Sequence, residues 1–232
     1  MKADIEVTWL GHAAWLVRSG SESLIIDPFL DDSPVASMKA KDVRVNYVLV
    51  SHGHADHVGD AAMIARNNKA TLLSNYEITE WFRTKHGVED VIGMNLGGSV
   101  SLPIGRVKLT LAFHSSQLPD GSYGGNPGGF LLSLSGTNLY FACDTALFGD
   151  MRQIGAAKLD LAVLPIGDLF TMGVDDAVEA IKLLQPCHVM PAHYNTWPVI
   201  AQDAEAWAKR VREETPSKPI VLQPGQSFRL PT

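Results

Sequence analysis

The chain has 232 residues, and 46% of them are hydrophobic, which is enough to fill one large buried core. No Pro/Ser-rich linker, charge block or low-complexity stretch divides the sequence, so we expect a single domain over residues 1–232. The formal net charge of -6 and the lack of a basic stripe argue against nucleic acid or an anionic membrane as a partner. We expect a cytoplasmic protein with no membrane span, because the N-terminal residues lack the apolar segment of a signal peptide and no apolar run approaches spanning length.

Three short strands open the chain as a predicted β-meander. Apolar and β-branched residues predict them over Asp4–Trp9, Ala13–Arg18 and Ser23–Ile26, with turns at Gly11-His12 and Ser19-Gly20. Asp27 ends the third strand, where it fits a simple turn residue. The stretch Leu30–Val45 has no clear period, so we expect a loop there.

A dense group of metal-ligand residue types follows the next strand. The apolar run Val48–Val50 predicts a buried strand, and His52-Gly53-His54-Ala55-Asp56-His57 comes soon after it. Residues i and i+2 at a strand end point the same way, so His52 and His54 can converge on one point. Asp56 and His57 lie on the way into a helix and point elsewhere, which suggests two metal positions. The alternative is that Asp56 only caps the helix and the histidines form an exposed polar loop.

Three later strands each end near one more residue that could bind a metal. Val107–Phe113 delivers His114, a hairpin over residues 130–142 leads to Asp144, and Cys187–Met190 leads to His193. Taken alone, His114 or His193 is more often a hydrogen-bonded polar residue than a ligand. Their shared place at strand ends, on one rim of a sandwich, favours a common metal site.

Helices and strands alternate through the second half of the chain. Apolar periodicity predicts three helices, one ending at Gly87, one from Asp175 to Pro186, and one centred on Trp207. Further short strands are predicted over Leu159–Pro165, Ile220–Leu222 and Ser227–Leu230. His188 lies inside a strand and matches no motif, so we interpret it as structural. Cys143 and Cys187 are expected to be reduced thiols in the core.

The motif that runs from His52 to His57 at a strand end resembles the hallmark of the metallo-β-lactamase superfamily. All four motifs of that family are present in its order and span nearly the whole chain. The resemblance implies an α/β fold, the four-layer αββα metallo-β-lactamase sandwich, with two divalent metal ions. It also implies that Asp27 supports the metal loop by hydrogen bonding. The implied ligands are His52, His54 and His114 for one metal and Asp56, His57 and His193 for the other, with Asp144 as the bridge.

A narrower likeness rests on four short segments. These segments resemble small bacterial metal-dependent hydrolases related to ascorbate-phosphate lactonase and to N-acylphosphatidylethanolamine phospholipase D. Cys143 replaces the usual small residue before the bridging carboxylate. His12 becomes a candidate proton donor or substrate contact, with a hydrogen-bonded turn histidine as the alternative. The four segments are Trp9-Leu10-Gly11-His12-Ala13, Ala142-Cys143-Asp144-Thr145, Phe170-Thr171-Met172-Gly173 and Pro191-Ala192-His193-Tyr194-Asn195-Thr196.

The implied ligand set contains imidazole and carboxylate but no thiolate, which suits Zn²⁺ first and also Mn²⁺ or Fe²⁺. Two such ions about 3.5–4 Å apart hold a hydroxide and polarise a carbonyl or phosphoryl oxygen. Asp144 would position that hydroxide, and the metal bound by Asp56 would take up charge on the leaving group. We therefore expect a hydrolase of a small ester, lactone or phosphoester. A metal-dependent nuclease or phosphodiesterase and a non-catalytic metal-binding scaffold are the alternatives.

The identity of the substrate is not indicated by these motifs. A small molecule is the expected partner, and a homo-oligomer is left open. The pocket is expected to be lined by three loops, Leu30–Val45, Ser115–Gly129 and Gly167–Gly173. Four apolar or aromatic side chains are candidates for its walls or, equally, for the core: Phe170, Met172, Tyr194 and Trp197.

Overall fold

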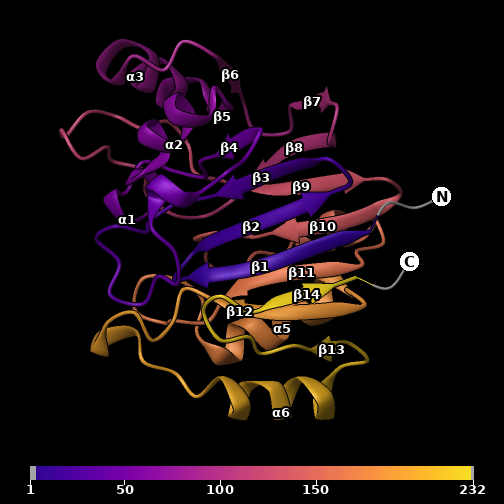
Figure 1. Cartoon of the computed structure of the whole chain (residues 1–232). Helices are drawn as coiled ribbons and strands as arrows, with labels where there is room; N and C mark the ends of the chain where they lie inside the picture. The colour runs from indigo at the N-terminus through magenta and orange to yellow at the C-terminus, as the bar shows by residue number, and fades with distance from the viewer. Residues whose placement is uncertain (1–3, 231–232) are drawn as a thin grey trace.

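Two seven-stranded sheets pack face to face in the computed structural model, which describes residues 4–230 (Figure 1). The first sheet contains, in spatial order, β14 (Ser227–Arg229), β1 (Ile5–Gly11), β2 (Ala14–Ser19), β3 (Glu22–Ile26), β4 (Tyr47–Leu49), β5 (Thr71–Asn75) and β6 (Val91–Met94). The second contains β13 (Lys218–Pro219), β12 (His188–Ala192), β11 (Leu161–Pro165), β10 (Thr137–Phe141), β9 (Gly128–Leu134), β8 (Gly105–Leu111) and β7 (Ser99–Leu102). Each sheet is antiparallel on one side and parallel on the other.

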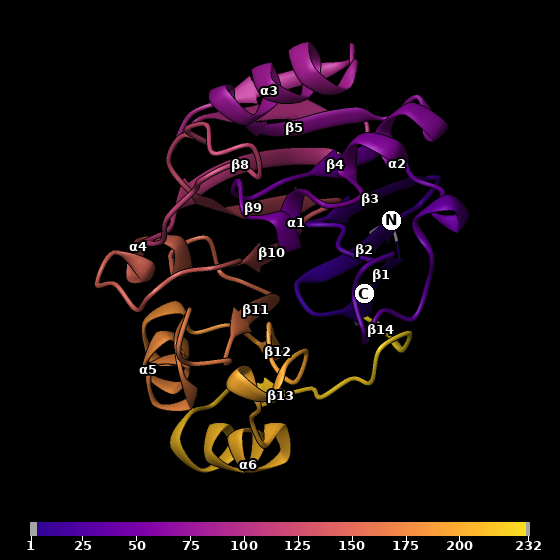
Figure 2. The same ribbon diagram turned by 90° about the vertical axis from the view of Figure 1, so that its left-hand side faces the viewer.

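Helices cover the outer sides of the two sheets. Figure 2 shows α3 on one side of the sandwich and α5 and α6 on the other. The helices beside the first sheet are α1 (Ala55–Val58), α2 (Ala61–Asn68) and α3 (Tyr76–His86), and those beside the second are α4 (Met151–Gly155), α5 (Val174–Leu184) and α6 (Ala204–Glu214). Two short 3₁₀ helices, η1 (Ala40–Asp42) and η2 (Pro198–Ile200), lie in loops. The predicted four-layer αββα sandwich is confirmed.

The strand before the metal motif is buried on both of its faces. Leu49 belongs to the core between the sheets, whereas Val48 and Val50 pack in a second cluster with Ile64 of α2 and Phe82 of α3. A strand covered on both sides must be apolar at every position, which explains the unbroken apolar run in the sequence. The motif that follows is therefore attached to one of the most deeply buried parts of the fold.

Most predicted elements are present, and two predictions from the C-terminal half are wrong. Ile220–Leu222 is not a strand, because β13 ends at Pro219 and the last hydrogen bond to β12 runs from the Ile220 backbone N–H to the Val189 carbonyl oxygen. Cys187 is exposed rather than in the core, since it lies just before the first residue of β12. None of the helices within residues 4–230 is long and apolar enough to cross a bilayer.

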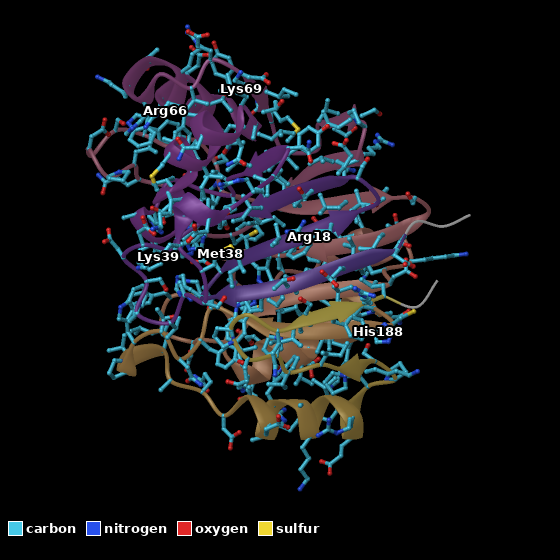
Figure 3. All side chains as sticks on the ribbon, viewed as in Figure 1. Arg18, Met38, Lys39, Arg66, Lys69 and His188 are labelled. Atoms are coloured by element: carbon cyan, nitrogen blue, oxygen red, sulfur yellow. The ribbon has the colours of Figure 1, made fainter. Side chains whose placement is uncertain are left out.

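The predicted ligands gather at one edge of the sandwich, where α1 carries Asp56 and His57. Figure 2 shows this edge, with α1 toward the viewer. Strands β3 and β4 are parallel, as are β10, β11 and β12, so their carboxyl ends reach this edge together. His188 marks the other end of β12 and is labelled in Figure 3. Its Nδ1 lies 3.2 Å from the Asp160 carbonyl oxygen, and it takes no part in the cluster.

Candidate active site

The structure brings all seven predicted metal ligands into one cluster. His52, His57, Asp144 and His193 are buried, and His54, Asp56 and His114 are half-buried. The histidines are therefore not an exposed polar loop. Asp56 lies in the first turn of α1, and no side chain caps that helix.

A buried carboxylate, Asp27, holds the metal motif through hydrogen bonds. Its Oδ1 accepts a hydrogen bond from the Ser51 backbone N–H at 2.7 Å, and its Oδ2 accepts one from the Ser51 hydroxyl at 2.6 Å. His57 Nδ1 lies 2.9 Å from the same Oδ2. Because a carboxylate can only accept, His57 carries its proton on Nδ1 and turns Nε2 toward the cluster. The supporting role implied for Asp27 is thus present as three hydrogen bonds.

Ser51 fixes the orientation of the next imidazole in the same way. Its hydroxyl donates its only proton to Asp27, so it must accept at its second contact, where His52 Nδ1 lies 2.9 Å away. His52 is therefore protonated on Nδ1, and its Nε2 points away from the serine. This Asp27–Ser51 pair presents a ring nitrogen of His52 and of His57 to the same space.

The first group of nitrogens comes from His52, His54 and His114. His54 Nδ1 lies 3.0 Å from His52 Nε2 and 3.3 Å from His114 Nε2. The outer nitrogen of His54, Nε2, lies 3.2 Å from the Ser115 hydroxyl. Their ligand atoms all lie within 4.8 Å of one another, as a shared metal ion requires.

The second group consists of Asp56, His57 and His193, with His12 beside them. Asp56 Oδ2 lies 3.7 Å from His193 Nε2 and 3.8 Å from His57 Nε2. Asp27 also falls within reach of a metal near His52 and His57, but its oxygens are already occupied by three hydrogen bonds. Asp27 therefore supports the ligands and is not one of them.

Asp144 lies between the two groups. Its Oδ2 is 3.1 Å from His193 Nε2 and 3.3 Å from His57 Nε2, and it is 3.6 Å from His114 Nε2 and 3.9 Å from His52 Nε2. One carboxylate oxygen thus faces nitrogens of both groups. This position suits a carboxylate that contacts both groups.

Several polar atoms of the cluster have no hydrogen-bond partner among the described residues. They are buried, and they belong to the proposed ligands: His57 Nε2, His193 Nδ1, His193 Nε2 and Asp144 Oδ1. Buried polar atoms in folded proteins are nearly always paired, so His57 Nε2 and His193 Nε2, which converge on the Asp144 carboxylate, call for a further partner. A divalent cation fits, because imidazole and carboxylate are the donors that such ions prefer.

The negative charge of Asp144 and the protonation of His57 and His193 depend on one another. Burial alone would raise the pKa of Asp144, but His193 and His57 hold the pKa of this carboxyl well below its usual range. Burial likewise opposes the charged form of His193, yet the Asp144 carboxylate raises the pKa of His193 to about 9. Without a metal, protons on these imidazoles balance the buried carboxylate, as cations would in the loaded site.

His12 is completely buried behind Asp56 and does not line the open pocket. Its Nε2 lies 3.0 Å from Asp56 Oδ2, and its Nδ1 lies 2.7 Å from the Thr196 hydroxyl. Burial lowers the pKa of His12 to about 4, although the hydrogen bond to Asp56 opposes this. The neutral ring therefore donates from Nε2 to the Asp56 carboxylate and accepts the Thr196 proton at Nδ1.

The comparison with known sequences decides the family. The β-lactamase superfamily domain matches residues 23–194. A UPF0173 metal-dependent hydrolase of Pelotomaculum thermopropionicum is 46% identical over 231 residues, which cover 97% of this chain and 100% of the relative. One from Thermus thermophilus is 46% identical over 226 residues, with coverage of 97% and 99%. The chain belongs to the UPF0173 metal-dependent hydrolases.

Solved structures agree with this assignment. Igni18, described as a novel metallo hydrolase from Ignicoccus hospitalis, superposes on the UPF0173 chain with a TM-score of 0.88 at 32% sequence identity. The superposition covers 99% of both chains. The metallo-β-lactamase resemblance of the motifs is confirmed, and so is the expectation of a metal-dependent hydrolase.

A pocket of about 290 Å³ opens above the cluster of the UPF0173 chain. Its floor consists of His54, Asp56, His114, Asp144 and His193, and its remaining lining residues are Ser115, Phe170 and Trp197. Of the four side chains considered for its walls, Met172 and Tyr194 instead belong to the core. The loop Leu30–Val45 contributes no lining residue within the described chain.

Three hydroxyl groups of the site were not singled out in the sequence of the UPF0173 chain. Ser51 orients His52, Ser115 contacts His54 and Thr196 contacts His12. Ser51 and Ser115 are direct chain neighbours of predicted ligands, and Thr196 lies three residues after the predicted ligand His193. Adjacency is the only signal that the sequence carries for them, because serine and threonine are common in loops.

Proposed function

We propose that this UPF0173 hydrolase binds two divalent metal ions and hydrolyses a small ester, lactone or phosphoester. The observation that carries the proposal is the position of Asp144 Oδ2 between the two groups of ring nitrogens. When bound, such ions supply an activated water and polarise the oxygen of the scissile group. Zn²⁺ is our first choice, and Mn²⁺ and Fe²⁺ suit the same ligands.

The ligands divide into two sets and one shared residue. His52, His54 and His114 hold the first ion, Asp56, His57 and His193 hold the second, and Asp144 contacts both. Asp144 also lines the pocket, where it positions the attacking water toward the substrate. Asp56 lines the pocket, and an ion held there would take up charge on the leaving group.

His12 serves this site as a positioning residue in our proposal. It is buried and lies on the far side of Asp56 from the pocket, so its imidazole supports the carboxylate and does not meet the substrate. The Thr196 hydroxyl keeps the His12 proton on Nε2, where Asp56 accepts it. Hydrogen bonds of this kind orient a ligand and tune its affinity for the metal.

The proposal is tested by removing the metals and restoring them. Chelation should abolish turnover of ester, lactone, thioester and phosphodiester panels, and Zn²⁺, Mn²⁺ or Fe²⁺ should restore it in proportion to the metal bound. Asp144→Ala should lose both turnover and metal. Asp176→Ala removes an exposed carboxylate from α5 and serves as the matched control, with both properties retained. Full turnover by a metal-free protein would contradict the proposal.

A further inference from the structure

Two aromatic side chains, Phe170 and Trp197, line the active-site pocket. Six large hydrophobic side chains are exposed within residues 4–230. One of them, Phe170, lines the pocket, and three more lie within two residues of a lining residue along the chain: Phe113, Leu169 and Val199. Aromatic side chains that line a pocket mark a place where an apolar group binds.

These walls are held in place relative to the metal ligands. Thr145, the residue after Asp144, accepts a hydrogen bond from the Phe113 backbone N–H at its hydroxyl, at 3.0 Å. Its carbonyl oxygen accepts one from the Met172 backbone N–H at 3.1 Å, which ties down the loop that carries Phe170. The second aromatic lining residue, Trp197, packs against the His12 ring at a centroid distance of 5.0 Å. The apolar surface is therefore preformed.

The polar groups of the pocket are almost all metal ligands. Of the described residues that line it, none is Lys or Arg. The only other polar side-chain groups are the Ser115 hydroxyl, which contacts His54, and the Trp197 indole. Sites that select phosphoryl groups usually add Arg or Lys to the metal, because several oxygens share the negative charge. When water attacks an uncharged carboxylic ester, negative charge develops on one oxygen only. Metal ions bound at the pocket floor can stabilise that charge without Arg or Lys.

We propose that the substrate is an uncharged carboxylic ester or lactone whose apolar group lies between Phe170 and Trp197. This inference rests on the proposed hydrolase function and names its substrate class. The scissile carbonyl faces the floor at Asp144, and the apolar substituent extends along the two aromatic walls. Water attacks the carbonyl carbon, the carbon–oxygen bond to the alcohol breaks, and the products are a carboxylic acid and an alcohol.

The test uses p-nitrophenyl acetate, butyrate and hexanoate with the metal-loaded protein, beside bis(p-nitrophenyl) phosphate. We expect kcat/KM to rise about 2- to 4-fold per added methylene, since each buried CH₂ favours the bound state. Phe170→Ser should lower the hexanoate-to-acetate ratio at least about fivefold, which corresponds to loss of one or two buried methylenes, with metal content unchanged. Tyr76→Ser is the matched control, because Tyr76 is 56% exposed and Phe170 54%. Tyr76 does not line the pocket, so its variant should keep the wild-type ratio.

The outcomes separate this inference from the proposed function. Hydrolysis of the phosphodiester in preference to all three esters, or esters turned over without dependence on chain length, would overturn the apolar ester assignment and leave the metal-dependent hydrolase standing. An unchanged ratio in Phe170→Ser would also overturn it. No metal-dependent turnover of any substrate in the panel would overturn both.

Discussion

His12 Nε2 lies 3.0 Å from Asp56 Oδ2, and the neutral imidazole donates a hydrogen bond to a carboxylate that faces the proposed second metal position. The backbone of His12 is left-handed, with φ of 53°, and its carbonyl oxygen accepts hydrogen bonds from the Trp9 indole and the His193 backbone N–H. A turn histidine held so firmly can fix the direction of the Asp56 carboxylate. His12 thus supports Asp56, which lies in the first turn of α1.

Replacing His12 by alanine should weaken one metal and not the other. We expect the dissociation constant of the second metal to rise about 10- to 100-fold, the usual effect of removing a hydrogen bond to a ligand. Competition with a chromogenic chelator measures both constants, and excess metal should restore most of the turnover. His12→Gln keeps an N–H donor and should be milder. If His12 were instead a proton donor, kcat would fall at saturating metal while both affinities stayed unchanged.

Ser51→Ala should cost both stability and metal affinity. The change removes a donor to Asp27 and an acceptor for His52, all of them buried, so we expect the free energy of unfolding to fall by about 1–3 kcal/mol. Urea titration of the metal-free protein measures this. Ser115→Ala deletes an exposed hydroxyl beside His54 and should change stability by less than about 0.5 kcal/mol. Equal effects of the two variants would argue against a special role for the Asp27–Ser51 pair.

Metal binding should release protons at neutral pH. In the metal-free protein the Asp144 carboxylate raises the pKa of His193 to about 9, against the effect of burial, so His193 is protonated at pH 7. The proton must leave before the nitrogen binds a cation, and affinity should therefore rise as the pH increases toward 9. Calorimetry in buffers of different ionisation enthalpy counts the protons. His188→Gln, far from the cluster, should leave the count unchanged, and a count of zero in the wild type would contradict the assignment of His193.

Gly167→Ala should disturb His193 through the backbone. A Cβ at Gly167 would lie 2.2 Å from the His193 carbonyl oxygen, a distance that requires one of the two segments to move. We expect a loss of about 1–3 kcal/mol in unfolding free energy, together with weaker binding of the second metal. Gly149→Ala is the control, because a Cβ there meets no atom within 4 Å. Equal stability of the two variants in urea titrations would contradict the prediction, because it would show that the backbone near His193 can move without cost.

The sequence carried much of the fold because buried strands and their ends leave strong signals. Val48–Val50 is apolar at every position, and ligand residue types follow it directly. The strands β5, β6 and β7 were not singled out, since they are short and their residues mix apolar with polar types. Their places in the sheets depend on pairing with the neighbouring strands β4 and β8 and with each other, which periodicity within one strand does not reveal.

The sequence could not show which way His12 points. A turn between two strands was predicted at Gly11-His12, but a left-handed backbone at a histidine leaves no compositional signal, and it is this backbone that positions the ring behind Asp56. Cys143 and His193 are left-handed as well, with φ of 53° each. The direction of several site residues therefore rests on turns that only the folded chain specifies.

The most direct test of the two-metal site is anomalous X-ray scattering from a metal-loaded crystal. We predict two peaks about 3.5–4 Å apart, one near His52, His54 and His114 and the other near Asp56, His57 and His193. Asp144 should contact both peaks, and His12 should lie within hydrogen-bond distance of Asp56. A single peak, or two peaks that Asp144 does not join, would contradict the proposed site.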